Sequence, residues 1–94
     1  DLSSKDLRKL VDEGKNYLKE GIVIVCASKD DKVGLAIGVT NSLTNDYDAV
    51  QLVKVGSEII GGKGGGGRKD FAQAGGSKKE KIDEAFKKIR TLIK

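Results

Sequence analysis

The segment Gly61-Gly62-Lys63-Gly64-Gly65-Gly66-Gly67-Arg68-Lys69-Asp70-Phe71-Ala72-Gln73-Ala74-Gly75-Gly76 contains eight of the thirteen glycines of this 94-residue chain. Three cationic side chains lie within the same run. Because glycine has no Cβ, it permits positive φ and lets another molecule reach main-chain N–H groups, at an entropic cost of roughly 0.5–1 kcal/mol per residue. We therefore predict that this segment is a loop whose backbone makes close contact with a partner.

The composition is that of one small domain with one core. The chain has no Trp and no Met, so the core is expected to consist of Val, Ile, Leu and Ala. Cys26 is the single cysteine and lies in an apolar run, so we expect it to be buried as a small hydrophobe. No apolar run approaches the roughly 20 residues that cross a bilayer, and the acidic start is unlike a signal peptide. These features predict a soluble, cytoplasmic protein with no membrane partner.

Positive charge is concentrated in the glycine-rich half of the chain. Residues 61–94 contain ten Lys or Arg and four Asp or Glu, so residues 1–60 carry a net charge of −2 within the total of +4. Such uneven charge favours a polyanionic partner, and nucleic acid is the usual one. A lysine-rich surface that contacts only solvent is the alternative.

Hydrophobic periodicity predicts an α+β fold, in which three helices pack with a small mixed or antiparallel sheet. Asp30-Asp31 lies between two apolar runs and is the expected turn of a hairpin. In chain order, the expected elements are helix 3–19, strand 22–28, strand 33–39, helix 49–60, a glycine loop with a short strand at 71–74, and helix 77–93.

The ends and faces of these elements give more specific expectations. Strand 33–39 has one face of small residues, so another backbone or a helix is expected to lie close against it. Asn45 or Asp46 is expected to cap the second helix. Ser77 and Glu80 have the spacing of a capping box, which predicts that the third helix starts there.

Nucleotide-binding and catalytic motifs are not supported. Gly62-Lys63 is followed by Gly64 rather than by Ser or Thr, and a helix precedes the glycines where a P-loop needs a strand. A G-x-G-x-x-G match means little in a run so rich in glycine. Because the chain has no histidine and one cysteine, it lacks the commonest general base and the ligands of a zinc site. We predict no catalytic residue, metal or cofactor.

The chemistry that remains is anion binding by backbone amides and cations. N–H groups of a glycine-rich segment form anion-binding concavities, and the N-terminus of the last helix adds free N–H groups and the positive end of its dipole. We expect both to converge on phosphates, with a flexible linker as the alternative. The predicted binding residues are Gly61, Gly62, Lys63, Gly64, Gly65, Gly66, Gly67, Arg68, Lys69, Gln73, Gly75, Gly76, Ser77, Lys78 and Lys79.

The glycine-rich run also resembles a known signature. Residues 61–66, followed by Asp70-Phe71-Ala72-Gln73-Ala74-Gly75-Gly76, are similar to the GGKGGG…DxAQxGG pattern of the C-terminal domain of alanyl-tRNA synthetase. The same domain family is appended to DHH-type phosphoesterases. Lys69 departs from the pattern, which often has proline at this position. The turn therefore gains a positive charge and loses the rigidity that proline would give its backbone. The resemblance covers nearly the whole chain.

The resemblance implies that residues 1–94 form one domain of a larger alanine-tRNA ligase. Such a domain is non-catalytic, contacts the tRNA elbow, promotes homodimer formation and works with the other domains of the parent synthetase. We expect Phe71 to pack in the core, with stacking on a base as the alternative. Two other functions remain open: an accessory nucleic-acid-binding domain of a DHH-type phosphoesterase, and a pure dimerisation module that uses the small-residue face of residues 33–39.

Overall fold

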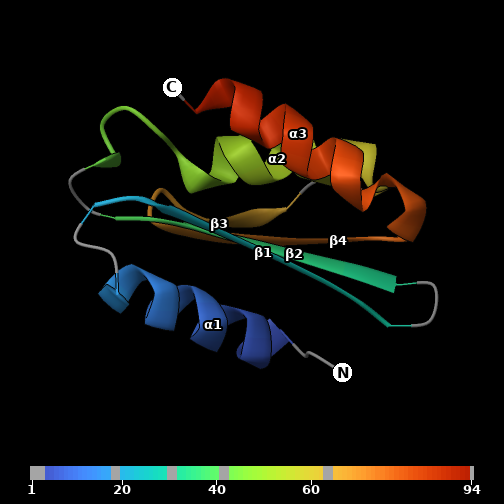
Figure 1. Ribbon diagram of the computed structural model, residues 1–94, viewed down its shortest axis with the longest axis horizontal. Helices are drawn as coiled ribbons and strands as arrows, with labels where there is room; N and C mark the ends of the chain where they lie inside the picture. The colour runs from blue at the N-terminus through green and yellow to red at the C-terminus, as the bar shows by residue number, and fades with distance from the viewer. Residues whose placement is uncertain (1–3, 18–19, 30–31, 41–42, 63–64, 94) are drawn as a thin grey trace.

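The computed structural model describes residues 4–17, 20–29, 32–40, 43–62 and 65–93. A four-stranded antiparallel sheet lies between one helix on one face and two helices on the other (Figure 1). The elements are α1 (Ser4–Tyr17), β1 (Ile22–Lys29), β2 (Lys32–Val39), α2 (Ala49–Ile59), β3 (Gly66–Arg68), β4 (Phe71–Gly76), the 3₁₀ turn η2 (Lys79–Lys81) and α3 (Ile82–Leu92). In the described segments, no helix has both the length and the apolar character that a bilayer crossing needs.

The predicted fold class is confirmed, as are the three helices and the three predicted strands, which are β1, β2 and β4. The sheet order is β1-β2-β4-β3, which places β2 and β4 at the centre and β1 at one edge. Alternate residues of β2, from Val33 to Val39, point into the larger core beneath α2 and α3. The expected turn at Asp30-Asp31 lies outside the described residues.

The small-residue face of β2 is covered by α1. This face belongs to a second core, in which Ala36 packs with Leu7 and Val11 of the helix. A Cβ at Gly38 would overlap Val11 Cγ1 and lie 2.9 Å from Lys15 Cδ. The expectation that a helix lies close against this face is therefore confirmed. The alternative use of the same face for dimerisation is wrong, because α1 already occupies it.

Two predicted helix caps are wrong. α2 begins one residue after Asp48, whose carboxylate accepts a hydrogen bond of 2.9 Å from the Val50 N–H. Neither Asn45 nor Asp46 is the cap, because the segment before Asp48 forms turns of its own. No side chain caps η2 or α3, so the Ser77 to Glu80 capping box does not form.

Candidate nucleic-acid interface

The glycine-rich segment forms a β-hairpin rather than an open loop. β3 pairs with β4 so that Gly66 lies opposite Gln73 and Arg68 opposite Phe71, with Lys69-Asp70 as the turn. β4 pairs with β2 on its other side, so the segment is part of the sheet. The short strand expected at 71–74 is confirmed as β4. The loop expected before it is corrected, because a run of glycines has no alternation of side chains from which strand β3 could be predicted.

Four glycines of the predicted site are required by the packing of the domain itself: Gly62, Gly65, Gly67 and Gly76. A Cβ at Gly62 would overlap the carbonyl oxygen of Gly75. One at Gly65 would overlap the carbonyl oxygen of Gln73. In both cases the obstacle is backbone, which has little freedom to move. These glycines let the end of α2 and the strand β3 lie directly against β4.

Gly66 and Gly75 have no such internal role. A Cβ at Gly66 would meet no described atom within 4 Å, and at Gly75 the nearest contact would be the Val33 carbonyl oxygen at 3.6 Å. Both residues share the α1 side of the sheet with half-buried Gln73, because Ala72 and Ala74 point into the opposite core. We call Gly66, Gln73 and Gly75 the open strip. It is a flat piece of sheet beside α1 with little side chain above it.

The structure separates the predicted cations into two groups. Arg68 and Lys69 lie at the β3–β4 turn, at one end of β4, whereas Lys78 and Lys79 follow the other end (Figure 1). All four residues are exposed. β4 has six residues, so the groups are on the order of 20 Å apart at about 3.3 Å per residue. The expectation that they converge on one phosphate site is wrong, although both flank the open strip. Lys63 and Gly64 lie outside the described residues.

Two N–H groups that directly precede the last helical segment are used within the fold. The N–H groups of Ser77 and Lys78 both donate to the Ile60 carbonyl oxygen, at 3.0 and 2.8 Å. The N–H of Lys81 donates to the Lys78 carbonyl oxygen at 3.0 Å. The first two of these bonds hold the end of β4 against the end of α2. The N–H groups of Ser77 and Lys78 therefore stabilise the fold, and the exposed side chains of Lys78 and Lys79 are accessible to a partner.

The turn of the hairpin is fixed by its neighbours. The Asp70 carbonyl oxygen accepts hydrogen bonds from the Val39 N–H at 2.9 Å and from Lys15 Nζ at 3.2 Å. The Asp70 carboxylate lies 3.6 Å from Arg68 Nε and 3.8 Å from Lys15 Nζ. The Lys69 carbonyl oxygen accepts from the Ala49 N–H at 2.9 Å. Lys69 is thus held in a defined turn without the proline that often stands at this position in the resembling pattern.

Phe71 packs in the core, as expected. It is 8% exposed and belongs to the cluster beneath α1. The Arg8 guanidinium lies over its ring, 5.2 Å from the centroid, in a cation–π contact. Sequence reasoning missed both Arg8 and Lys15 as neighbours of the hairpin. No signal in the sequence could have found them, because only the packing of α1 across the sheet brings them there.

The described residues contain no group of three or more His, Cys, Asp or Glu side chains that could hold a metal ion. The features of the described residues that could bind a partner are the open strip, the two pairs of exposed cations and the hydrogen-bonded backbone of the hairpin. A family model for the DHHA1 domain matches residues 1–94.

The chain belongs to the DHHA1 domain family. Curated relatives of this DHHA1 domain include alanine--tRNA ligases from Parvibaculum lavamentivorans, 50% identical over 98% of the chain, and Hyphomonas neptunium, 46% identical over 99%. Another, from Bradyrhizobium diazoefficiens, is 49% identical over 98% of the chain. The domain covers 10 to 11% of the length of these relatives.

A solved structure has the same fold. The C-Ala domain of Aquifex aeolicus alanyl-tRNA synthetase superposes with a TM-score of 0.93 at 30% sequence identity, over 99% of this chain and 83% of the other. The resemblance seen in the glycine-rich signature is therefore confirmed for the family and for the fold.

Proposed function

We propose that this DHHA1 domain is a non-catalytic part of an alanine-tRNA ligase and that it binds the tRNA elbow. The observation that carries the proposal is the open strip of the β3–β4 hairpin, which has exposed cation pairs at both ends. The similarity of the whole chain to a small part of alanine--tRNA ligases supports the parent enzyme. A cytoplasmic location of that enzyme is part of the proposal. Catalysis then belongs to other domains of the parent chain.

The geometry fits a folded RNA surface better than a single phosphate. RNA of this kind is recognised mainly by its shape and by contacts to phosphates and 2′-hydroxyls. Gly66 and Gly75 allow a sugar or base to lie directly on the sheet, because no side chain stands above them. Arg68-Lys69 and Lys78-Lys79 are spaced to contact phosphates at the two borders of that surface. Gln73, in the middle of the strip, has the donors and acceptors to bind a 2′-hydroxyl or a base edge.

The alternative parent, a DHH-type phosphoesterase, is less well supported. Four relatives that match 98 to 99% of the chain at 44 to 50% identity are alanine--tRNA ligases. The sequence that precedes this domain in its gene distinguishes the two parents, since synthetase domains and phosphoesterase motifs differ.

Self-association is the second function that we propose, because the family resemblance implies a homodimer. The small-residue face of β2 cannot serve, since Ala36 is fully buried under α1. Any dimer contact of this domain must therefore use another surface.

Replacing Gly66 with Val tests the tRNA contact. The new side chain projects into open space, so we expect stability to be unchanged within about 0.5 kcal/mol, as for ordinary surface substitutions. It also stands between the sheet and the RNA, so affinity for tRNA should fall at least tenfold in filter binding. Lys54→Val, on the exposed face of α2, is the matched control and should retain affinity. Normal tRNA binding by a folded Gly66→Val variant would disprove contact through the open strip.

A further inference from the structure

β1 is an edge strand that can pair with a further strand. It is hydrogen-bonded to β2 on one side and is the last strand of the sheet on the other. Its eight residues carry no charge between Ile22 and Ser28, and the chain has no proline to interrupt it. Edge strands of natural proteins are usually short, charged, interrupted or covered, because a bare edge pairs with other chains. A long apolar edge of this kind indicates that something covers it.

The backbone of β1 is oriented for such pairing. In an antiparallel ladder, two opposite residues either exchange hydrogen bonds or both turn their N–H and C=O groups away from each other. Val39, which lies opposite Ile22, donates its N–H to Asp70, on the β4 side. The backbone groups of Ile22 therefore point away from β2, and by alternation so do those of Ile24.

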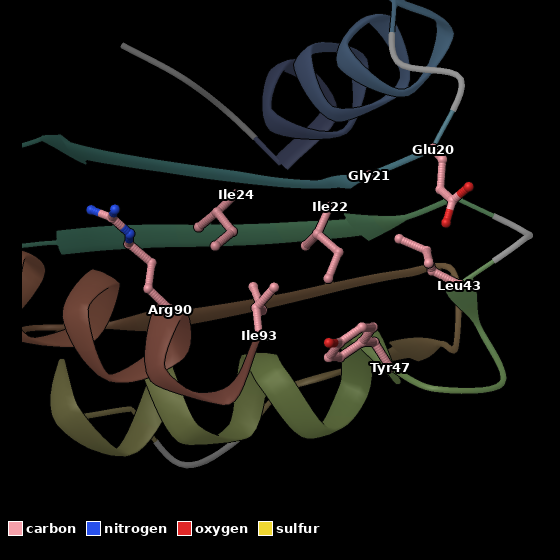
Figure 2. A pocket seen from close by; sticks show the side chains of 8 residues that line it. All are labelled: Glu20, Gly21, Ile22, Ile24, Leu43, Tyr47, Arg90 and Ile93. Carbon is pink, nitrogen blue, oxygen red and sulfur yellow. The ribbon is translucent and has the colours of Figure 1, made fainter.

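An apolar groove runs along the same edge. It has a volume of about 590 Å³ and lies between β1, the segment before α2 and the end of α3 (Figure 2). Ile22 and Ile24 project from β1 into the groove and face Ile93 across it, with Tyr47 near one end. α2 and α3 cover the other strands on this face but leave the side chains of β1 half-buried. The groove and the strand edge form one continuous surface.

The charges of the groove are self-complementary. Glu20 lies at one end, beside the start of β1, and Arg90 lies at the other, near Ile24 (Figure 2). A two-fold interface brings a surface against an identical copy of itself. Each charged group on such a surface must therefore find a group of opposite charge on the same surface of the other copy. If two copies meet across β1 in antiparallel orientation, the groove ends exchange places. Glu20 of each copy then lies beside Arg90 of the other.

We propose that the β1 edge and its groove bind a second copy of this chain, in an antiparallel two-fold arrangement. Backbone hydrogen bonds between the two β1 strands supply the register, and the isoleucines of the two grooves pack together. This inference rests on the proposed self-association and assigns it a surface. A polyanionic partner is disfavoured here, because the groove is apolar and carries one charge of each sign. The dimer surface is distinct from the open strip of the hairpin.

Charge reversal tests the arrangement in the 94-residue chain. Glu20→Arg and Arg90→Glu should each weaken the dimer by roughly tenfold at low salt, because each creates two like-charge contacts per dimer. When the two variants are mixed in equal amounts, both contacts become attractive again, so the mixture should form heterodimers. Sedimentation velocity over a concentration series measures all three samples. Glu13→Arg, the same charge change on the exposed face of α1, is the control and should dimerise like the original chain.

Several results would overturn the proposal. The proposal is wrong if the original chain stays monomeric at high concentration. It is also wrong if the mixture of the two variants associates no better than either variant alone. Ile24→Lys places a charge at the edge and should abolish dimers while circular dichroism stays unchanged; dimers that persist would contradict the assigned surface. Binding of tRNA by Ile24→Lys is measured separately. Loss of dimers with tRNA binding retained separates this inference from the elbow contact.

Discussion

At the scale of single residues, glycine serves two opposite purposes in one hairpin. Gly62 and Gly65 are glycine because the domain's own backbone lies where a Cβ would stand. Gly66, between Gly65 and Gly67, faces open space. Packing alone accounts for Gly62 and Gly65, so the glycines that support contact with RNA are Gly66 and Gly75.

Alanine substitutions separate the two kinds of glycine. Gly62→Ala should lower the free energy of unfolding by about 1–3 kcal/mol, because the new methyl group overlaps the Gly75 carbonyl oxygen and the backbone must shift. Gly66→Ala should be neutral or slightly stabilising, since it reduces the entropy of the unfolded chain without a clash. Urea unfolding followed by circular dichroism measures both. Equal stability of the two variants would contradict this division.

Cys26 gives a prediction about pH. The residue is half-buried on β1 rather than buried as expected, because the helices leave this edge strand partly uncovered. Desolvation raises the pKa of its thiol above the ordinary value of 9.0, although the hydrogen bond with the Ala27 backbone acts in the opposite direction. Because the folded state holds the proton more tightly, the stability from this group is complete below pH 9 and is lost as pH rises through the folded pKa. Alkylation by iodoacetamide should be slower than for a free thiol at pH 8. A rate that reaches its plateau below pH 9 would contradict the assignment.

At the scale of elements, the two faces of the sheet are built on different principles. The α2–α3 face uses large aliphatic side chains from β2, such as Leu35 and Ile37, to fill a thick core. The α1 face uses small residues, so the helix lies close to the strand and contributes Leu7 and Val11 to a thin core. Close approach is also what brings Lys15 to the turn at Asp70. α1 therefore helps to hold the hairpin turn, together with the hydrogen bonds from Val39 and Ala49.

A larger side chain on the face of β2 that contacts α1 should weaken the packing of α1 against the sheet. Gly38→Ala adds a Cβ that overlaps Val11 Cγ1, so we expect a loss of about 1–3 kcal/mol and faster amide hydrogen exchange in α1 than in α2. Gly75→Ala is the control, because it lies on the same side of the sheet beyond the helix and has 3.6 Å of clearance. If exchange accelerates equally in both helices, α1 does not dock as an independent element.

At the scale of the whole molecule, the length of β4 determines how charge is presented. A loop would have brought the cations together, whereas the hairpin holds Arg68-Lys69 and Lys78-Lys79 at opposite ends. In the proposed complex the two pairs would contact different phosphates of one RNA, because they are too far apart to form a single anion site. The proposed dimer would place two such hairpins on one particle.

Salt dependence tests this separation. Replacing both Arg68 and Lys69 with Ala should reduce the steepness of log affinity for tRNA against log salt by roughly 1.5, as expected for the loss of two phosphate contacts. Replacing Lys78 and Lys79 should have a similar effect, and the two losses should add, because distant sites act independently. An unchanged slope in either double variant would show that the pair does not contact RNA.

Local chemistry in the sequence was enough to predict the helices, the strands β1, β2 and β4, the α+β class and the family signature. Those features depend on periodicity and on residues close together in the chain. Three features were not predictable from the sequence: strand β3, the cap at Asp48, and the difference between glycines that packing requires and glycines that face open space. Each depends on which residues distant in the chain lie next to it in the fold. A glycine run has the same pattern whether it is loop or strand, and only pairing with β4 makes it a strand. The open strip and the exposed β1 edge likewise exist only because three helices cover this sheet incompletely.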